Sequence, residues 1–319
     1  MRCLVLGGGG FLGGHLISAL LEEGHEVRAF DRSAHRARAD QPDAEWREGD
    51  FGNRGDLLAA VDGCDIAFHL IATTLPRTSN EDPVHDLESN LLPTVRFLDI
   101  ARDLGLRKVI FASSGGTVYG TPSIVPIPET HPTRPVCSYG IHKLAIEHYL
   151  HLYYTLYGLD YGVLRLANPF GERQRTDASQ GAVAVFLDKA LRGEEAVIWG
   201  DGSVVRDYLY VKDAAAAFCA VARHASETKT FNIGSGQGQS LNELLAAIES
   251  VLGEPVRRRY QPGRPFDVPV NVLDTSLAAD VLGWRPRVSF RDGLIRTLAW
   301  LRAARAESSA VDRGVRPVS

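Results

Sequence analysis

The chain has 319 residues, 45% hydrophobic and 23% charged, which is typical of a globular protein with a buried core. A formal net charge of −4 leaves no electrostatic footprint for nucleic acid, and no run of about 18 apolar residues predicts a membrane span. Its four cysteines lack CxxC spacing, so we expect no bound metal, no disulfide framework and a reduced, cytoplasmic setting.

The first half of the chain alternates short apolar runs with helical patterns. Strands are predicted at Arg2–Leu6, Glu26–Phe30, Ile66–Ile71, Lys108–Ala112 and Tyr161–Leu166, and helices at Phe11–Glu23, Arg54–Val61, Val84–Leu104 and Tyr139–Tyr157. Strands that alternate with helices predict a parallel sheet covered on both faces, because crossover connections are right-handed. The expected fold class is α/β, a doubly wound parallel sheet of the Rossmann type.

Beyond Asn168 the segments are shorter and glycines interrupt them. Helices are predicted there at Ala182–Arg192, Lys212–Arg223, Leu241–Leu252 and Ser276–Leu282. We expect a smaller C-terminal α/β lobe that closes over the carboxyl edge of the sheet and binds substrate. On this interpretation residues 1–167 form the Rossmann domain, with 204–233 returning to it, 168–301 form mainly the substrate lobe, and 302–319 form a flexible tail.

The segment LVLGGGGFLGGHL places a glycine turn between a predicted strand and a predicted helix. Gly7, Gly10 and Gly13 follow the spacing G-x-x-G-x-x-G. Only glycine combines positive φ with close approach of the backbone to a pyrophosphate, and the helix that follows presents unpaired N–H groups to it. The pattern therefore predicts a dinucleotide-binding site.

Asp31 ends the second predicted strand. A carboxylate at this place can accept hydrogen bonds from both adenosine ribose hydroxyls and would repel a 2′-phosphate, which predicts NAD rather than NADP. Arg32 either stacks on the adenine or points to solvent. Asp50, in the segment EGDF, is a weaker candidate for the adenine edge.

Tyr139 and Lys143 have the spacing Y-x-x-x-K. Four residues apart on a helix they share one face, with a rise of about 6 Å. A free phenol has a pKa of about 10, so a tyrosine base at neutral pH needs a pKa about three units lower, or roughly 4 kcal/mol. We expect the Lys143 ammonium and a positive nicotinamide to supply this. Upstream, FASSGGTVYG offers the hydroxyls of Ser113, Ser114 and Thr117 to a substrate hydroxyl.

Together these motifs resemble the extended short-chain dehydrogenase/reductases of the NAD-dependent epimerase/dehydratase family, and within it the UDP-glucose 4-epimerases most of all. The resemblance runs from Met1 to about Trp300. Its motifs include GGGGFLGGH, HLIA, SSGGTVYG, YGIHK, LRLANPFG, GDGSVVRDYLYVKD, FNIGSG, GRPFDVPVNVLD and LGWRP.

The resemblance also assigns binding residues. Asn168, Arg206 and Arg264 would bind the diphosphate of a UDP-sugar, since a guanidinium fork suits phosphate oxygens, and Asp267 would bind the uridine ribose. Asn90 would support the loop that positions Lys143. The expected cofactor-binding residues are completed by Phe11, Leu12, Phe51, Leu70, Ala72, Thr73, Asn90 and Ser113.

One position departs from the family pattern. The family usually has Ser or Thr three residues before the valine of VYG, where this chain has Gly115. Either Ser114 takes that role after a small backbone shift, or Thr117 does, and we favour Ser114.

The implied reaction inverts C4 of a UDP-hexose. Tyr139 would remove the 4-hydroxyl proton while C4 gives hydride to NAD, and the 4-keto sugar would turn before hydride returns. The acidic pair of the related dehydratases is replaced by Gly116 and Thr117, Asp31 disfavours an NADPH-dependent ketoreductase, and the Tyr139–Lys143 pair disfavours a non-catalytic NAD-binding sensor.

The sugar is less sharply indicated. We favour UDP-glucose and UDP-galactose, with UDP-GlcNAc or UDP-glucuronate as alternatives. Asn271 would lie near the sugar C2, and it is smaller than the tyrosine that excludes an N-acetyl group in similar enzymes.

The helix predicted at Tyr139–Tyr157 is apolar nearly all round, with four tyrosines in its second half. One face must pack on the sheet, so a second covered face is expected. We predict a homodimer through this helix and Val84–Leu104, as the resemblance also implies.

Overall fold

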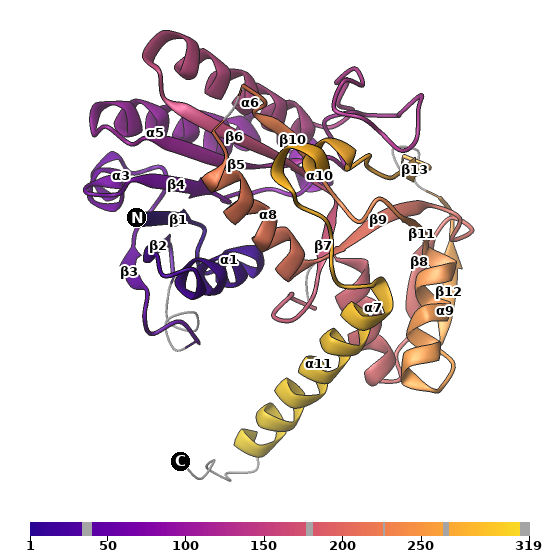
Figure 1. Ribbon diagram of the computed structural model, residues 1–319. Helices are drawn as coiled ribbons and strands as arrows, with labels where there is room; N and C mark the ends of the chain where they lie inside the picture. The colour runs from indigo at the N-terminus through magenta and orange to yellow at the C-terminus, as the bar shows by residue number, and fades with distance from the viewer. Residues whose placement is uncertain (34–39, 177–180, 226, 264–267, 313–319) are drawn as a thin grey trace.

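The computed structural model describes residues 1–33, 40–176, 181–225, 227–263 and 268–312 (Figure 1). Seven strands form one parallel sheet in the order β10-β6-β5-β4-β1-β2-β3. They are β1 (Arg2–Leu6), β2 (Glu26–Asp31), β3 (Glu45–Glu48), β4 (Ile66–His69), β5 (Lys108–Ser114), β6 (Asp160–Leu166) and β10 (Thr230–Ile233). The predicted doubly wound fold is confirmed, and the strand order reverses beside β1, where such sheets bind ligands.

Helices cover both faces of this sheet, so its central strands are nearly continuous apolar runs. On one face α1 (Phe11–Glu22) packs beside α8 (Val211–Arg223). The other face carries α3 (Arg54–Val61), α5 (Leu92–Asp103) and α6 (Ser138–Tyr157). None of the helices in the described part of the chain has the length and hydropathy needed to cross a membrane.

A second, smaller lobe is built on short strands (Figure 1). Strands β11, β9 and β13 form one small sheet in which β7 also pairs with β9, while β12 pairs with β8. The strands are β7 (Asn168–Phe170), β8 (Ala196–Trp199), β9 (Val205–Tyr210), β11 (Gly238–Ser240), β12 (Arg258–Gln261) and β13 (Val270–Asn271). The helices are α7 (Ala182–Leu191), α9 (Leu241–Leu252), α10 (Ser276–Leu282) and α11 (Phe290–Asp312), of which α7, α9 and α11 share one apolar core with β8 and β9.

The structure corrects several predicted boundaries. β9 belongs to the small sheet, so the segment that returns to the large sheet begins at Val211 rather than at residue 204. The predicted helix Val84–Leu104 is three pieces, α4 (Pro83–Asp86), a π-helical turn (Leu87–Leu91) and α5, because Pro93 has no N–H for a regular α-helical bond. α11 continues to Asp312, so residues 302–312 are helical rather than a flexible tail.

A buried carboxylate joins the two lobes. Asp207 on β9 is fully buried and accepts hydrogen bonds from Ser235 Oγ at 2.6 Å and from the backbone N–H groups of Ser235, Gly236 and Leu273. Ser235 and Gly236 follow β10 of the large sheet, so the small sheet is tied to the carboxyl end of the large one.

Candidate active site

A cleft of about 1820 Å³ lies at the carboxyl ends of the large sheet and is walled by both lobes. This volume exceeds that of pockets for a single small ligand, so a dinucleotide and a second molecule can share it. Of the predicted site residues, the cleft is lined by Gly10, Phe11, Leu12, Asp31, Arg32, Leu70, Ala72, Ser113, Ser114, Thr117, Tyr139, Lys143, Asn168 and Arg206.

The glycine loop between β1 and α1 leaves no room for side chains. Gly7 has a φ of +89°, and a Cβ on Gly13 would lie 2.2 Å from the Gly7 carbonyl oxygen. The first turn of α1, which starts after Gly10, has no side-chain cap and no acidic residue. Its N–H groups therefore face the cleft as an anion site, which fits the diphosphate of a dinucleotide.

Asp31 stands beside this loop at the end of β2. Its Oδ2 accepts a hydrogen bond from the Gly9 N–H at 3.0 Å and its Oδ1 accepts one from the Arg32 N–H at 2.7 Å. An ionised carboxylate has acceptor capacity beyond these two bonds, so Asp31 can still bind ribose hydroxyls.

Several predicted cofactor residues do not line the cleft. Gly7 and Gly13 shape the loop from behind, and Asp50 accepts a hydrogen bond from the Gly52 N–H. Phe51 is buried against His69, with ring centroids 5.0 Å apart.

Asn90 and Thr73 also lie behind the cleft wall. The Asn90 Oδ1 accepts a hydrogen bond from the Thr73 N–H at 2.9 Å, and Asn90 Nδ2 donates to the Asp86 carbonyl at 2.9 Å. Asn90 thus holds the loop after β4, and its predicted role toward Lys143 stays a proposal.

Tyr139 and Lys143 lie in the first two turns of α6 and face the cleft together. Lys143 Nζ lies 5.5 Å from the centroid of the Tyr139 ring and donates a hydrogen bond to the Ala112 carbonyl at 2.9 Å. Desolvation lowers the pKa of the buried Lys143 to about 7 and raises the pKa of the half-buried Tyr139 above its ordinary value.

Lys143 is not among the causes of the Tyr139 shift, of which desolvation is the largest, so the expected lowering of the phenol pKa by Lys143 and nicotinamide stays a prediction. A lysine with a pKa of about 7 carries only about half a charge near neutral pH, and Cys137 and Asp86 add to the rise of the phenol pKa. The protein's own groups therefore keep the Tyr139 phenol protonated.

The three candidate hydroxyls above Tyr139 differ in their surroundings. Ser113 Oγ donates its proton to the Glu147 carboxylate, which is paired with Arg165, so toward the cleft it can act only as an acceptor. Ser114 lines the cleft, and the buried Thr117 Oγ1 has no hydrogen-bond partner among the described residues. Ser114 and Thr117 therefore both remain candidate partners of Tyr139.

The structure gives a packing reason for glycine at position 115. A Cβ there would lie 2.6 Å from the Leu273 side chain and 3.1 Å from the Arg165 carbonyl oxygen. Leu273 is fully buried and fills the space that a serine or threonine would need.

On the substrate side, Asn168 and Arg206 come from β7 and β9. Asn168 Nδ2 donates to the Asp207 carbonyl at 3.1 Å, and Arg206 Nη1 donates to the carbonyls of Val205 and Val268 at 2.8 and 2.7 Å. These bonds orient both side chains at the cleft wall. Arg264 and Asp267 lie outside the described residues.

Asn271 does not stand where we expected it. It is 1% exposed, does not line the cleft, and its Nδ2 donates to the Gly115 carbonyl at 3.0 Å. It therefore supports the Gly115 turn from behind.

Sequence reasoning missed Arg173, which lines the cleft and has a φ of +66°. Its Nη1 lies 3.4 Å from the place of a Cβ on Gly14, and its Nε lies 3.8 Å from an Asp40 oxygen. The neighbouring Glu172 carbonyl accepts a hydrogen bond from His15 on α1 at 2.9 Å. The Arg173 guanidinium thus lies over the first turns of α1, and its backbone is held in a costly left-handed conformation. No motif or residue spacing predicted this position.

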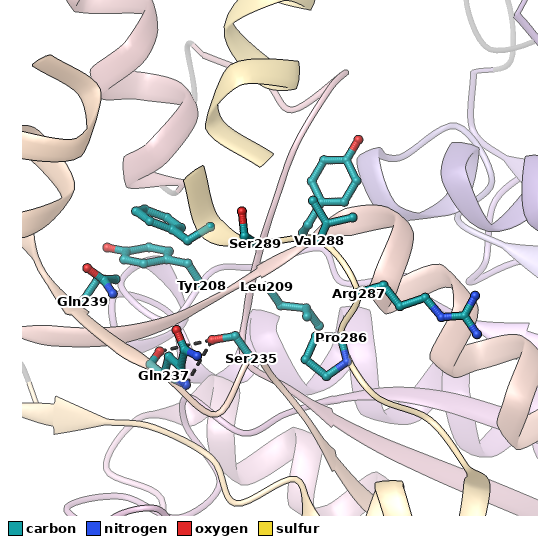
Figure 2. A pocket seen from close by; sticks show the side chains of 11 residues that line it. Tyr208, Leu209, Ser235, Gln237, Gln239, Pro286, Arg287, Val288 and Ser289 are labelled. Carbon is teal, nitrogen blue, oxygen red and sulfur yellow. Dashed lines mark hydrogen bonds between the residues drawn. The ribbon is translucent and has the colours of Figure 1, made fainter. Parts of the chain in front are cut away.

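A second pocket, of about 270 Å³, lies in the smaller lobe and shares only Tyr208 with the cleft (Figure 2). The Tyr208 ring stacks on Phe290 with centroids 5.6 Å apart, and Ser235 and Gln237 lie below Tyr208 in this view. Across the described ranges, no cluster of His, Cys, Asp or Glu is arranged to hold a metal ion.

The structure combines a Rossmann-type sheet, a glycine loop for a dinucleotide, and a tyrosine and a lysine that face the same cleft. This combination defines an NAD-dependent enzyme of the short-chain dehydrogenase/reductase class. Residues 3–234 match the model of the NAD dependent epimerase/dehydratase family. The chain belongs to that family, which confirms the predictions of NAD as cofactor and of a nucleotide-sugar epimerase.

The chain is similar to the UDP-glucose 4-epimerase of Mycolicibacterium smegmatis, 37% identical over 310 residues that cover 95% of this chain and 99% of that one. The Thermotoga maritima UDP-glucose 4-epimerase, solved with UDP-glucose, has a TM-score of 0.89 at 36% identity and 95% and 99% coverage. The Thermus thermophilus enzyme, solved with NAD, has the same TM-score at 35% identity and 95% and 100% coverage.

Relatives with other sugars in their names have nearly the same fold. A UDP-N-acetylglucosamine 4-epimerase from Methanobrevibacter ruminantium has a TM-score of 0.88 at 29% identity, covering 95% of this chain and 98% of that one. Overall similarity therefore identifies the enzyme class and leaves the sugar to the site.

Proposed function

We propose that this enzyme interconverts a UDP-hexose and its C4 epimer, with UDP-glucose and UDP-galactose as the principal pair. The observation that carries the proposal is the placement of Tyr139 and Lys143 in the cleft that also contains the dinucleotide loop. The names of the relatives described above support the choice of sugar.

In this proposal Tyr139 takes the proton of the 4-hydroxyl and later returns it. Ser114 or Thr117 holds that hydroxyl, and Thr117 Oγ1 has a buried, unpartnered oxygen to offer. The chemistry that NAD supplies when bound is reversible acceptance of hydride at C4. Because desolvation raises the pKa of the phenol, the phenolate would need a further source of stabilisation, which the positive charge of a bound oxidised nicotinamide would supply.

Anchoring of the nucleotide lets the oxidised sugar turn without escaping. Asn168 and Arg206 would hold the diphosphate, with Arg264 as a further predicted contact and Asp267 on the uridine ribose. Binding energy from this remote part of the substrate retains the 4-keto sugar while its other face turns toward the hydride.

The acetamido sugar is the second candidate. The side chain of Asn271 is buried behind Gly115, so it does not sterically exclude a substituent on C2 of the sugar. UDP-glucuronate is third, and a dehydratase is disfavoured because Gly116 and Thr117 provide no carboxylic acid.

The test is to offer UDP-glucose, UDP-GlcNAc and UDP-glucuronate separately to the purified enzyme with NAD. We expect UDP-galactose from UDP-glucose, with no net change in the absorbance of reduced nicotinamide because the cofactor is regenerated. Conversion of only the acetamido or uronic pair would refute the sugar assignment, and net consumption of NADH or NADPH would show a reductase.

We also propose that the protein is a homodimer through α4, α5 and α6. Large apolar side chains of α6 lie on its solvent side, with Leu152 44% and Leu156 59% exposed, and Val84 on α4 and Leu92 on α5 are exposed as well. An apolar face of this kind is typical of a covered surface. The cytoplasmic setting stays a prediction.

Leu152→Glu is expected to shift the protein from dimer to monomer in sedimentation at micromolar concentration, because two charges would be buried at the contact. Ile295→Glu, an equally exposed apolar residue on α11, is the matched control and should leave a dimer. A wild-type protein that sediments as a monomer would refute the proposal.

A further inference from the structure

The first turn of α6, which carries Tyr139, is not capped by its own residues. The N-cap residue Cys137 makes no side-chain capping bond. Instead Ser79 Oγ accepts a hydrogen bond from the Tyr139 N–H at 3.0 Å, and Asn80 Oδ1 accepts one from the Ser138 N–H at 2.9 Å. Orphan donors at the start of the catalytic helix are thus satisfied by a segment about 60 residues upstream.

The same segment places Asp86 beneath this turn. Asp86 is fully buried, and Ser138 Oγ donates to its Oδ2 at 2.7 Å while His142 Nδ1 donates to the same oxygen at 2.9 Å. Its other oxygen accepts hydrogen bonds from Thr74 Oγ1 and Asn90 Nδ2. The carboxylate therefore ties two residues of α6 to the loop and helix that follow β4.

His142 is the middle member of this arrangement. It is fully buried and lies between Tyr139 and Lys143 in the sequence, with its ring centroid 5.0 Å from that of Tyr139. Since an ionised carboxylate only accepts, the proton of the neutral imidazole lies on Nδ1. Its buried Nε2 has no partner among the described residues.

No lysine or arginine pairs with Asp86 in the part of the chain that the structure describes. Burial opposes its ionisation, but the hydrogen bonds from Thr74, His142 and Ser138 outweigh this and lower its pKa. Burial also lowers the pKa of His142 to about 4, so the imidazole is neutral near pH 7. A negative charge without a direct lysine or arginine partner among the described residues therefore lies under the catalytic turn.

The other titratable groups around the catalytic pair do not cancel this charge. His69 on β4 is buried with its pKa lowered, and the Cys137 thiol has its pKa raised, both by burial. Glu147, one turn beyond Lys143, is paired with Arg165 at 2.6 Å. Asp86 raises the pKa of both Tyr139 and Lys143.

We propose that Asp86 is a positioning residue for the catalytic turn: through Ser138 and His142 its buried carboxylate fixes the backbone that presents Tyr139, and its charge acts on the Tyr139–Lys143 pair. This inference rests on the proposed function, in which Tyr139 is the base. Asp86 and His142 thereby have a role that the Y-x-x-x-K motif alone does not show.

Asp86→Asn tests the charge, because the amide has the same shape and can donate to Ser138 Oγ or to the other tautomer of His142. Both limbs of the kcat–pH profile should move to lower pH, by about half a unit to one unit, since neutralising the carboxylate lowers the pKa of both Tyr139 and Lys143. A structural role alone would lower the plateau without moving the limbs.

Glu88→Gln is the matched control, since it removes the same charge from an exposed residue on the adjoining π-helical turn, and it should move neither limb. His142→Asn keeps a donor near the place of Nδ1 and should keep both limbs in place. His142→Leu removes the donor and should lower kcat about tenfold at unchanged KM, through misplacement of Tyr139.

A second readout does not need turnover. Near-ultraviolet difference titration of the NAD-bound protein, with Tyr139→Phe subtracted, reports the Tyr139 phenolate directly and should shift downward in Asp86→Asn. Unmoved limbs and an unmoved titration in Asp86→Asn would overturn the charge effect, and wild-type kcat in His142→Leu would overturn the positioning. If Asp86→Asn fails to fold, the kcat of His142→Leu decides whether the Asp86–His142 contact positions Tyr139. If the wild type converts no UDP-sugar, the proposed function fails while the titration still judges Asp86.

Discussion

Replacing Tyr139 with phenylalanine is expected to lower kcat by a factor of about 10² to 10⁴, the range that a positioned acid–base group contributes. The ring stays, so its edge contact with His142 at 5.0 Å and the packing of α6 are kept, and only the phenolic oxygen is lost. Bound NAD should remain, because the glycine loop and Asp31 are unchanged. Turnover of UDP-glucose and the NAD content of the purified protein are the two measurements.

Tyr149→Phe is the matched control, since Tyr149 lies on the same helix at the surface and away from the cleft. Its kcat should be that of the wild type. A Tyr139→Phe enzyme that turns over within tenfold of the wild type would remove Tyr139 from its role as base. Loss of NAD from that variant would instead point to a cofactor-binding role.

Gly13→Ala is expected to weaken NAD binding by about 10- to 100-fold. The new Cβ would lie 2.2 Å from the Gly7 carbonyl oxygen and 2.9 Å from the Gly8 Cα, both backbone atoms that no side-chain rotation can move away. Overpacking of this kind costs about 1–3 kcal/mol, and here the strain falls on the loop that must approach the diphosphate. Calorimetric titration with NAD measures the loss.

Gly55→Ala provides the comparison, because it adds the same methyl group to the first turn of α3, where the nearest atom is the Asn53 side-chain oxygen at 3.3 Å. That variant should bind NAD as the wild type does. Unchanged NAD affinity in a folded Gly13→Ala protein would show that the loop does not hold the diphosphate.

The parts of this structure that could be predicted from the sequence are those that local spacing encodes. Buried parallel strands are apolar runs, so β1, β4 and β5 were recognisable, and the glycine loop and the Tyr139–Lys143 pair each lie within one short segment. β3 was missed because Glu45–Glu48 is a four-residue edge strand of mostly polar residues, with neither an apolar run nor alternation.

The remaining features depend on contacts between distant segments. The Asn271 amide meets Gly115 across 156 residues, and Leu273 explains why that position is glycine. Ser113 donates to Glu147 because β5 packs under α6, which links this cleft residue to the buried Glu147–Arg165 ion pair. Residue types and spacing do not predict such contacts between distant segments.

Asp86 and His142 illustrate the limit most directly. His142 was visible inside the YGIHK motif and Asp86 stands four residues before Asn90, yet the two meet across 56 residues only when α4 packs on α6. A buried carboxylate is costly enough that its position in a sequence says little until its four donors are known.

The carboxylate of Asp207 has a consequence for how the catalytic cycle can proceed. A hinge motion that separated the small sheet from β10 would remove the donors of Ser235 and Gly236 from this buried carboxylate. Losing these donors would be costly for a buried carboxylate, so we expect the two walls of the cleft to stay close together throughout turnover.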